Sequence, residues 1–260
     1  MDNNVTLNNR KFGLTAFDLK IIAIIFMTVD HFTYLWYYDL ANYAGTELLP
    51  VLLRSSGRFT FPIMVFMIAE GYFHTRNKFK YAGRLFVFSF ISMYPFYLME
   101  DTPWNVICTL FMGLFLLIMR DLCAETFSAI DTKIWTAIFL VISFVTSVGL
   151  YFYDWGFAGI FVIYIAGQIK DAKSRAILVP VLLFMGYIVS DFVVVGSFPP
   201  EFAYTSIDAY SLIHYCGLFF VIPLLLLYNG EKGYTKEPYT KYLFYVYYPL
   251  HILILSLIKF

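Results

Sequence analysis

Two adjacent ionisable residues, Asp30 and His31, interrupt the first long apolar run of the sequence. An imidazole is the side chain most often used for general base catalysis, and a carboxylate close to it fixes its tautomer and raises its basicity. Neighbouring positions on a helix point about 100° apart, so the two side chains need not touch each other. The pair therefore predicts either a general base, His31, oriented by Asp30, or a structural hydrogen bond between two helices.

Arg58 occupies the next apolar run, between Gly57 and Pro62. Glycine and proline at such a place predict a broken or kinked helix. A permanently charged guanidinium there needs an anionic partner, which is either Asp30 or an oxyanion formed on a substrate. Arg58 completes the predicted catalytic set with His31 and Asp30; a purely structural ion pair with Asp30 is the alternative.

Glu70, Tyr248 and His251 are further polar residues inside or at the end of apolar runs, and we predict that they line the same substrate cavity. Ionisable groups at membrane depth usually face a cavity or a partner. The sequence contains no P-loop, HExxH or GxSxG motif, and its three cysteines are far apart without metal-ligand spacing. We therefore expect no metal site and find no support for a serine hydrolase or a metalloprotease.

Basic residues gather near the opposite ends of the same runs. Lys20 precedes His31 by eleven positions, which on a helix is three turns and places both on nearly one face, about 16 Å apart. Arg76, Lys80 and Arg84 follow the second apolar run. These residues are candidates for holding phosphates, although Lys20 alone is also explained as an interfacial lysine and the others as an ordinary cytoplasmic loop.

The segments that must position these residues are predicted to be transmembrane helices. Of 260 residues, 60% are hydrophobic and 14% charged, which is more apolar surface than a soluble domain of this length can cover. The zero net charge gives no footprint for nucleic acid. We predict an all-α fold: a polytopic membrane helix bundle in which residues 1–260 form a single domain. About nine apolar runs recur along the chain: 15–38, 50–73, 79–99, 104–119, 133–150, 155–169, 175–193, 207–228 and 239–258. Several are at the short end of the ~17–25 residues that a crossing needs, and the sixth is shorter still.

The orientation of the bundle follows from where lysine and arginine fall. If the N-terminus is cytoplasmic, nearly all of them lie in inner loops, while the outer loops are acidic. This distribution obeys the positive-inside rule. It predicts an odd number of spans, with the N-terminus in the cytoplasm and the C-terminus outside.

Several stretches together resemble the TraX family, which is named for the acetylase of conjugative pilin. They are residues 19–31, 57–62, 70–77 and 80–85 and the ending Tyr248-Pro249-Leu250-His251. Between about residues 100 and 240 only the pattern of spans is similar. The likeness extends to transmembrane acyltransferases that modify sugars and cell-surface polymers. Those enzymes carry a basic residue, ten spacers and a histidine on an early span, the spacing at which Lys20 and His31 stand.

The resemblance implies an O- or N-acetyltransferase in the bacterial cytoplasmic membrane. Its donor would be acetyl-CoA, held from the cytoplasm by Lys20, Arg76, Lys80 and Arg84, and its histidine would activate an acceptor at the outer side. The acceptor class stays open among pilin, another peptide, a glycan and a lipid-linked sugar, and membrane lipids are the other expected partners. Two alternatives also stay open: a transporter or permease, which paired intramembrane charges describe equally well, and a non-catalytic membrane assembly factor.

Overall fold

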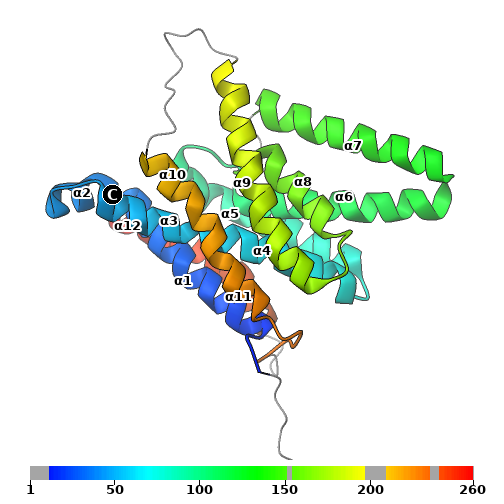
Figure 1. Ribbon diagram of the computed structural model, residues 1–260, viewed down its shortest axis with the longest axis horizontal. Coiled ribbons are helices and arrows are strands. Elements are labelled where there is room, and N and C mark those ends of the chain that lie inside the picture. The colour runs from blue at the N-terminus through cyan, green and yellow to red at the C-terminus, as the bar shows by residue number, and fades with distance from the viewer. Residues whose placement is uncertain (1–11, 151–153, 197–208, 235–239, 260) are drawn as a thin grey trace, which may run out of the picture.

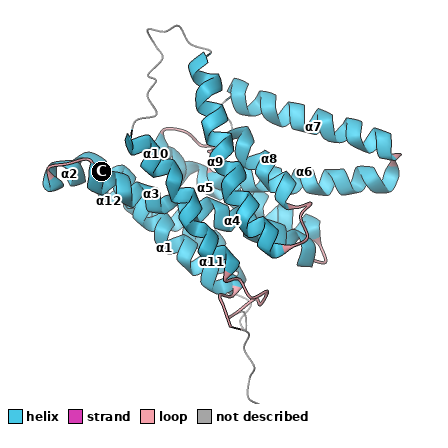
Figure 2. Cartoon of the chain, viewed as in Figure 1, coloured by secondary structure: helices cyan, strands magenta, loops and turns pink. Residues whose placement is uncertain are grey.

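A computed structural model describes residues 12–150, 154–196, 209–234 and 240–259. All secondary-structure elements named within these residues are helices (Figures 1 and 2). The all-α prediction is therefore confirmed. In chain order the helices are α1 (Ala16–Leu35), α2 (Tyr37–Ala44), α3 (Leu48–Ser56), η1 (Gly57–Phe59), α4 (Thr60–His74), α5 (Lys78–Glu100), α6 (Val106–Thr126), α7 (Ala129–Leu150), α8 (Gly156–Ala166), α9 (Ala172–Gly196), α10 (Ala209–Cys216), η2 (Gly217–Val221), α11 (Ile222–Leu226) and α12 (Thr240–Lys259).

Six helical segments in the described residues are long and apolar enough to cross a membrane, and α1 with α2, bent by 81°, makes a seventh candidate. Two other apolar helical segments are shorter, namely α8 and the α10–α11 segment (Leu212–Leu226). Each of the nine predicted runs thus contains a helix, but by length and composition only six or seven are candidate crossings, so the count of nine is not confirmed. This is the pattern of a multi-pass membrane protein.

Side-chain caps fix the beginning of three helices that carry site residues. Thr15 and Asp18 form a capping box at the start of α1, which satisfies backbone donors of the first turn. The side chains of Asn77 and Asn105 accept hydrogen bonds from first-turn amides of α5 and α6, respectively, at 2.8 and 3.1 Å. The helix starts are therefore set locally by the sequence.

The helix running from α3 to α4 is interrupted at η1, where the sequence predicted a break between Gly57 and Pro62. A Cβ atom on Gly57 would lie 2.3 Å from the Asp30 Cγ atom, so only glycine allows α1 to pack this closely. The Thr60 hydroxyl of α4 donates to the Ala23 carbonyl of α1 at 3.0 Å, which adds a hydrogen bond between the two helices next to this contact. This close contact brings the arginines of α3 and η1 beside the end of α1.

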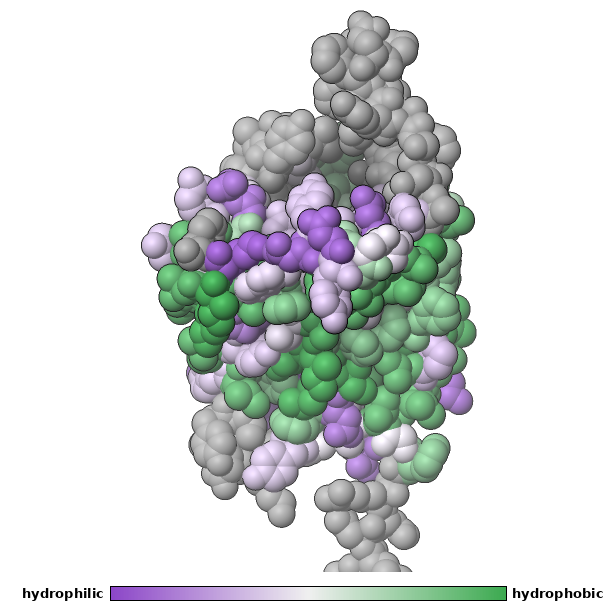
Figure 3. Space-filling model, turned by 90° about the vertical axis from the view of Figure 1, so that its left-hand side faces the viewer, coloured by the Kyte–Doolittle hydropathy of each residue, from purple (hydrophilic) through white to green (hydrophobic). Residues whose placement is uncertain are grey.

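Helix α4 lies at the centre of the bundle, in contact with α1, α6, α8 and α9, while α5 packs between α6 and α12. Helix α6 also packs against α8, and its connection to α7 extends beyond the other helices at one side of the bundle (Figure 1). On the face shown in Figure 3, hydrophobic residues form a broad band, with hydrophilic residues above it and, more sparsely, below it. Such a band is what a surface facing the hydrocarbon of a bilayer requires.

Candidate active site

A small pocket lies where α1 ends and α6 begins, with a cavity volume of about 80 Å³. Its wall comes from α1, α3, η1, α4, α5, α12, the first residue of α6 and the turn before α8. The three predicted catalytic residues and Tyr248 all line it. Its polar and ionisable lining residues are Asp30, His31, Arg54, Arg58, Thr60, Glu100, Asp154 and Tyr248.

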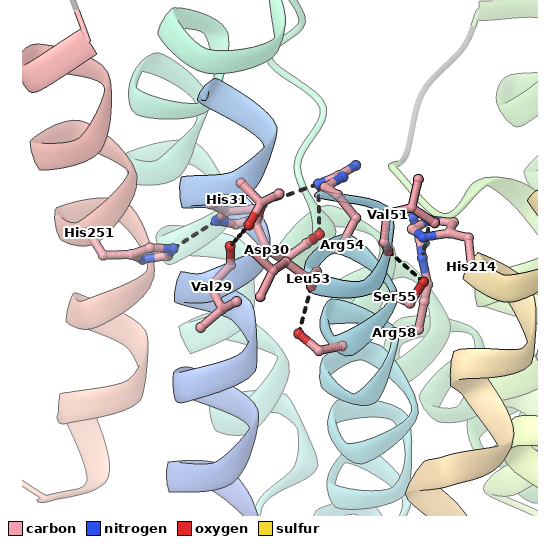
Figure 4. A network of polar contacts seen from close by, with 12 residues as sticks. Val29, Asp30, His31, Val51, Leu53, Arg54, Ser55, Arg58, His214 and His251 are labelled. Carbon is pink, nitrogen blue, oxygen red and sulfur yellow. Dashed lines mark hydrogen bonds and ion pairs between the residues drawn. The ribbon is translucent and has the colours of Figure 1, made fainter. Parts of the chain in front are cut away.

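His31 is hydrogen-bonded to His251 of α12, and their ring nitrogens Nδ1 and Nε2 are 2.8 Å apart (Figure 4). The two ring planes are parallel to within 5°. His251 Nδ1 in turn lies 2.9 Å from the backbone carbonyl oxygen of Tyr247, one helical turn earlier. Three groups on two helices therefore form a continuous chain of hydrogen bonds.

The direction of this chain follows from the carbonyl group at its end. A carbonyl oxygen only accepts, so the hydrogen of a neutral His251 is on Nδ1 and its Nε2 is an acceptor. His31 must then donate from Nδ1, which leaves the lone pair of a neutral His31 on Nε2. The fold thereby assigns one tautomer to the histidine that lines the pocket.

Asp30 pairs with an arginine of α3 and not with His31, which was one of the two possibilities left by the sequence. Its carboxylate Oδ1 lies 2.7 Å from Arg54 Nη1, and the same nitrogen is 3.4 Å from the Asp30 backbone oxygen (Figure 4). The prediction that Asp30 orients His31 is corrected, because adjacent helical positions diverge and Asp30 faces α3 while His31 faces α12. Its arginine partner is also Arg54 and not Arg58, since Arg54 stands one helical turn nearer the end of the bundle.

Arg58 is held by aromatic and imidazole groups of α9, α10 and the turn before α8. Its Nε donates to His214 Nε2 at 2.7 Å, and its Nη1 donates to the Tyr187 hydroxyl at 2.7 Å. The guanidinium carbon lies 5.2 Å from the ring centre of Trp155 and 5.5 Å from that of Tyr187. Among the described residues no carboxylate forms an ion pair with Arg58, so within this part of the chain its charge is open to an anion in the pocket.

Two further carboxyl groups, those of Glu100 and Asp154, also line the pocket. Asp154 is exposed where it opens onto the pocket, yet the protein atoms packed around its carboxyl and the nearby Glu100 carboxylate raise the pKa of Asp154 to about 7. No spacing in the sequence links these residues to Asp30, because the loop contacts that gather them are long-range.

The family described as TraX protein matches residues 17–259 of the chain. The chain belongs to the TraX family. The probable fimbrial assembly protein FimC, serogroup H1, of Dichelobacter nodosus is 29% identical over 268 residues, covering 96% of this chain and 98% of that protein. No solved structure matches the chain.

Glu70, which the TraX resemblance also includes, lies away from this pocket. At the far end of α4 it forms an ion pair with Arg175 of α9, and Tyr228 Oη donates to its Oε2 at 3.4 Å. Arg175 is only 1% exposed, and Nη1 of its guanidinium also donates to the carbonyls of Ile169 and Lys170. Of the three residues predicted to line the substrate cavity, only Tyr248 lines the pocket. Glu70 lies elsewhere, and His251 contacts the pocket residue His31 from α12.

The four basic residues that the TraX resemblance assigned to the donor are not gathered around one pocket. Arg76 and Lys80 are exposed where α4 joins α5. Arg84 lies over the Tyr81 ring at 5.5 Å, and the Lys20 ammonium lies 5.3 Å from the Phe244 ring centre. None of the four lines the pocket of His31.

Proposed function

We propose that this TraX-family chain is a membrane-embedded acyltransferase in which His31 is the general base. The chain of hydrogen bonds from the Tyr247 carbonyl through His251 carries the proposal, because it assigns the His31 lone pair to Nε2. A base needs such a lone pair beside a substrate cavity, and His31 lines the pocket. Arg54 and Arg58, which line the same pocket, provide positive charge that can stabilise an oxyanion.

In the proposed reaction, His31 Nε2 takes the proton of an acceptor amine or hydroxyl while that nitrogen or oxygen bonds to the acyl carbonyl carbon. Arg58 faces the oxyanion that forms, with Arg54 and its partner Asp30 holding the neighbouring wall. Preorganised charge of this kind is commonly the largest contribution to such a reaction. His31 then returns the proton to the sulfur as the carbon–sulfur bond breaks. The activated thioester is what acyl-CoA, the donor, supplies.

The size of the pocket restricts the acyl group. A cavity of about 80 Å³ holds a few water-sized groups, which suits an acetyl group and not a long fatty acyl chain. Only the acyl end of acetyl-CoA is therefore assigned to the pocket.

We further propose nine crossings of the bacterial cytoplasmic membrane, with the N-terminus in the cytoplasm and the C-terminus outside. Both short helical segments support this count. Trp155 before α8 lines the pocket of His31, and Gly167 after α8 lies in a second pocket at the opposite end of the bundle. Likewise, His214 of α10 contacts Arg58 beside the pocket of His31, whereas Tyr228, just after α11, contacts Glu70 at the far end of α4. Alkaline phosphatase fused to the C-terminus should be active in cells, and activity only for a cytoplasmic reporter there would refute the orientation.

The name of the FimC relative favours a fimbrial subunit as the acceptor. It equally favours a second candidate function, a non-catalytic role in assembling fimbriae. The two differ in one observable: an enzyme leaves an acyl group on its acceptor, whereas an assembly factor leaves the subunit unmodified.

Transfer of radiolabelled acetyl from acetyl-CoA to membrane or pilus protein tests the proposal. His31→Ala should lower the rate by ~10²–10⁴-fold, the usual contribution of a general base. His74→Ala is the matched control, because His74 lies exposed at the far end of α4. Full acetylation by a normally inserted His31→Ala protein would refute the proposal, and an unmodified acceptor in wild-type cells would favour the assembly role.

A further inference from the structure

A second, larger pocket lies at the other end of the bundle and is lined by positively charged residues. Its cavity volume is about 420 Å³, within the range typical of small-molecule sites. Its lining residues come from the end of α4, the start of α5, the last turns of α6 and the turn between α8 and α9: Tyr72, Phe73, Lys78, Arg120, Gly167, Gln168 and Lys170.

Two of its cations are fixed by one carboxylate. Asp121 lies 2.7 Å from Lys78 Nζ through Oδ2 and 2.8 Å from Arg120 Nη2 through Oδ1. The Tyr72 hydroxyl donates to the same Oδ2 at 2.6 Å and accepts from Arg120 Nη2 at 2.8 Å. The amine and the guanidinium are therefore held close together before any ligand arrives.

The pocket has an excess of positive charge. Lys170 adds a third cation to Lys78 and Arg120, whereas Asp121 is the carboxylate that contacts them. Arginine carries five donor hydrogens and lysine three, so donors remain after the bonds to Asp121 are counted. Convergent lysine and arginine donors recognise phosphate oxygens especially well.

Aromatic groups form the apolar part of the wall. The Tyr72 and Phe73 rings meet edge to face with centres 5.4 Å apart, and the Lys78 ammonium lies 4.0 Å from the Tyr72 ring centre. A ligand that combines phosphate with a flat or apolar organic part matches both features.

We propose that this pocket binds the phosphate groups of an organic phosphate, through Lys78, Arg120 and Lys170. The phosphate can belong to a soluble nucleotide-type ligand or to the headgroup of an anionic lipid. The inference does not depend on the chemistry proposed for His31. It also differs from the sequence prediction, which gave the phosphates to Lys20, Arg76, Lys80 and Arg84; none of these four lines the pocket.

Binding to the full-length protein, purified into phosphatidylcholine nanodiscs, distinguishes the two sets of basic residues. Coenzyme A is the soluble probe, followed by isothermal titration calorimetry. Retention of phosphatidylglycerol, followed by native mass spectrometry, is the lipid probe. Lys170→Gln and Arg120→Gln are the pocket variants, and Arg76→Gln and Lys80→Gln are the matched controls.

Each pocket variant should weaken binding of at least one probe about tenfold, the loss expected for one charge-assisted contact, while the controls change it less than twofold. Loss for coenzyme A alone assigns the site to a soluble phosphate ligand, and loss for phosphatidylglycerol alone assigns it to lipid. The inference is overturned if neither probe binds, or if the control variants lose as much as the pocket variants. Lys170 is exposed, so Lys170→Gln keeps the test valid should Arg120→Gln fail to fold.

Discussion

Replacing His251 with alanine separates the proposed tautomer control from catalysis itself. In the wild-type protein, His251 Nε2 accepts from His31 Nδ1 because its own Nδ1 is committed to the Tyr247 carbonyl. Without that acceptor, His31 is free to carry its hydrogen on either nitrogen and to rotate. We expect kcat to fall while KM for the acyl donor stays nearly constant, because the change affects the base and not the binding of donor.

The structure limits the size of this effect. His251→Ala removes one hydrogen bond between neutral groups, which is worth about 0.5–1.5 kcal/mol and corresponds to a ~2–13-fold lower kcat. Deleting the base itself should cost far more, ~10²–10⁴-fold. We therefore expect kcat to be highest for the wild type, lower for His251→Ala and lowest for His31→Ala.

Initial rates of acetyl transfer at several donor concentrations provide the measurement. His251→Gln should recover part of the loss, because its amide oxygen can accept from His31. Tyr247→Phe is the matched control: it removes the hydroxyl that contacts Thr28 at 2.7 Å but keeps the backbone carbonyl. If His251→Ala is fully active, the chain does not orient His31. If it is as inactive as His31→Ala while correctly folded, His251 itself has an essential role.

Three further predictions concern packing, pairing and donor length. Gly57→Ala should destabilise the protein by about 1–3 kcal/mol in thermal unfolding, since its Cβ would collide with Asp30; Gly83→Ala, with nothing within 4 Å of the new atom, should be neutral or slightly stabilising. Arg175→Met should cost about 3–5 kcal/mol by leaving Glu70 buried without its partner, and adding Glu70→Gln should restore most of the loss; equal melting temperatures of the single and double variants would contradict this. The short donor S-acetyl-N-acetylcysteamine should give a kcat/KM at least about a hundredfold below that of acetyl-CoA, because it lacks the remote groups that position a substrate; comparable values would refute the need for a long donor.

Local sequence signals predicted the helices. They also predicted that polar residues of the first two spans, His31 and Arg58, line one cavity. His31 and Arg58 line the same pocket as expected, because helix periodicity and the depth of charged residues are encoded locally. The partners of these residues were not predictable. Whether Asp30 pairs with Arg54 or Arg58 depends on a displacement of one helical turn between two packed helices, and no residue spacing in the sequence determines it.

The basic residues illustrate the same limit at the other end of the bundle. Residues 76, 78 and 80 follow one another in a polar turn, and composition treats Arg76, Lys78 and Lys80 alike. Only Lys78 reaches the larger pocket, because Asp121, more than forty residues later, holds it there. The sequence therefore identifies a basic turn but not which of its residues lines a cavity.

If the proposed function and the proposed phosphate site both hold, the two pockets explain how an acyl group crosses while its carrier does not. Helix α6 begins beside the small pocket at Val106 and reaches the larger one at Arg120, a distance of about 20 Å along the helix axis. A donor with phosphates held at the basic end must therefore be long and thin to present its thioester to His31. In this scheme the small pocket, about 80 Å³, takes the acyl group and the larger pocket, about 420 Å³, takes the phosphates, so the donor would bind in one direction only. If both proposals hold, charge-neutralising changes at Lys170 should raise KM for acetyl-CoA with little change in kcat, the reverse of the effect expected for His251→Ala.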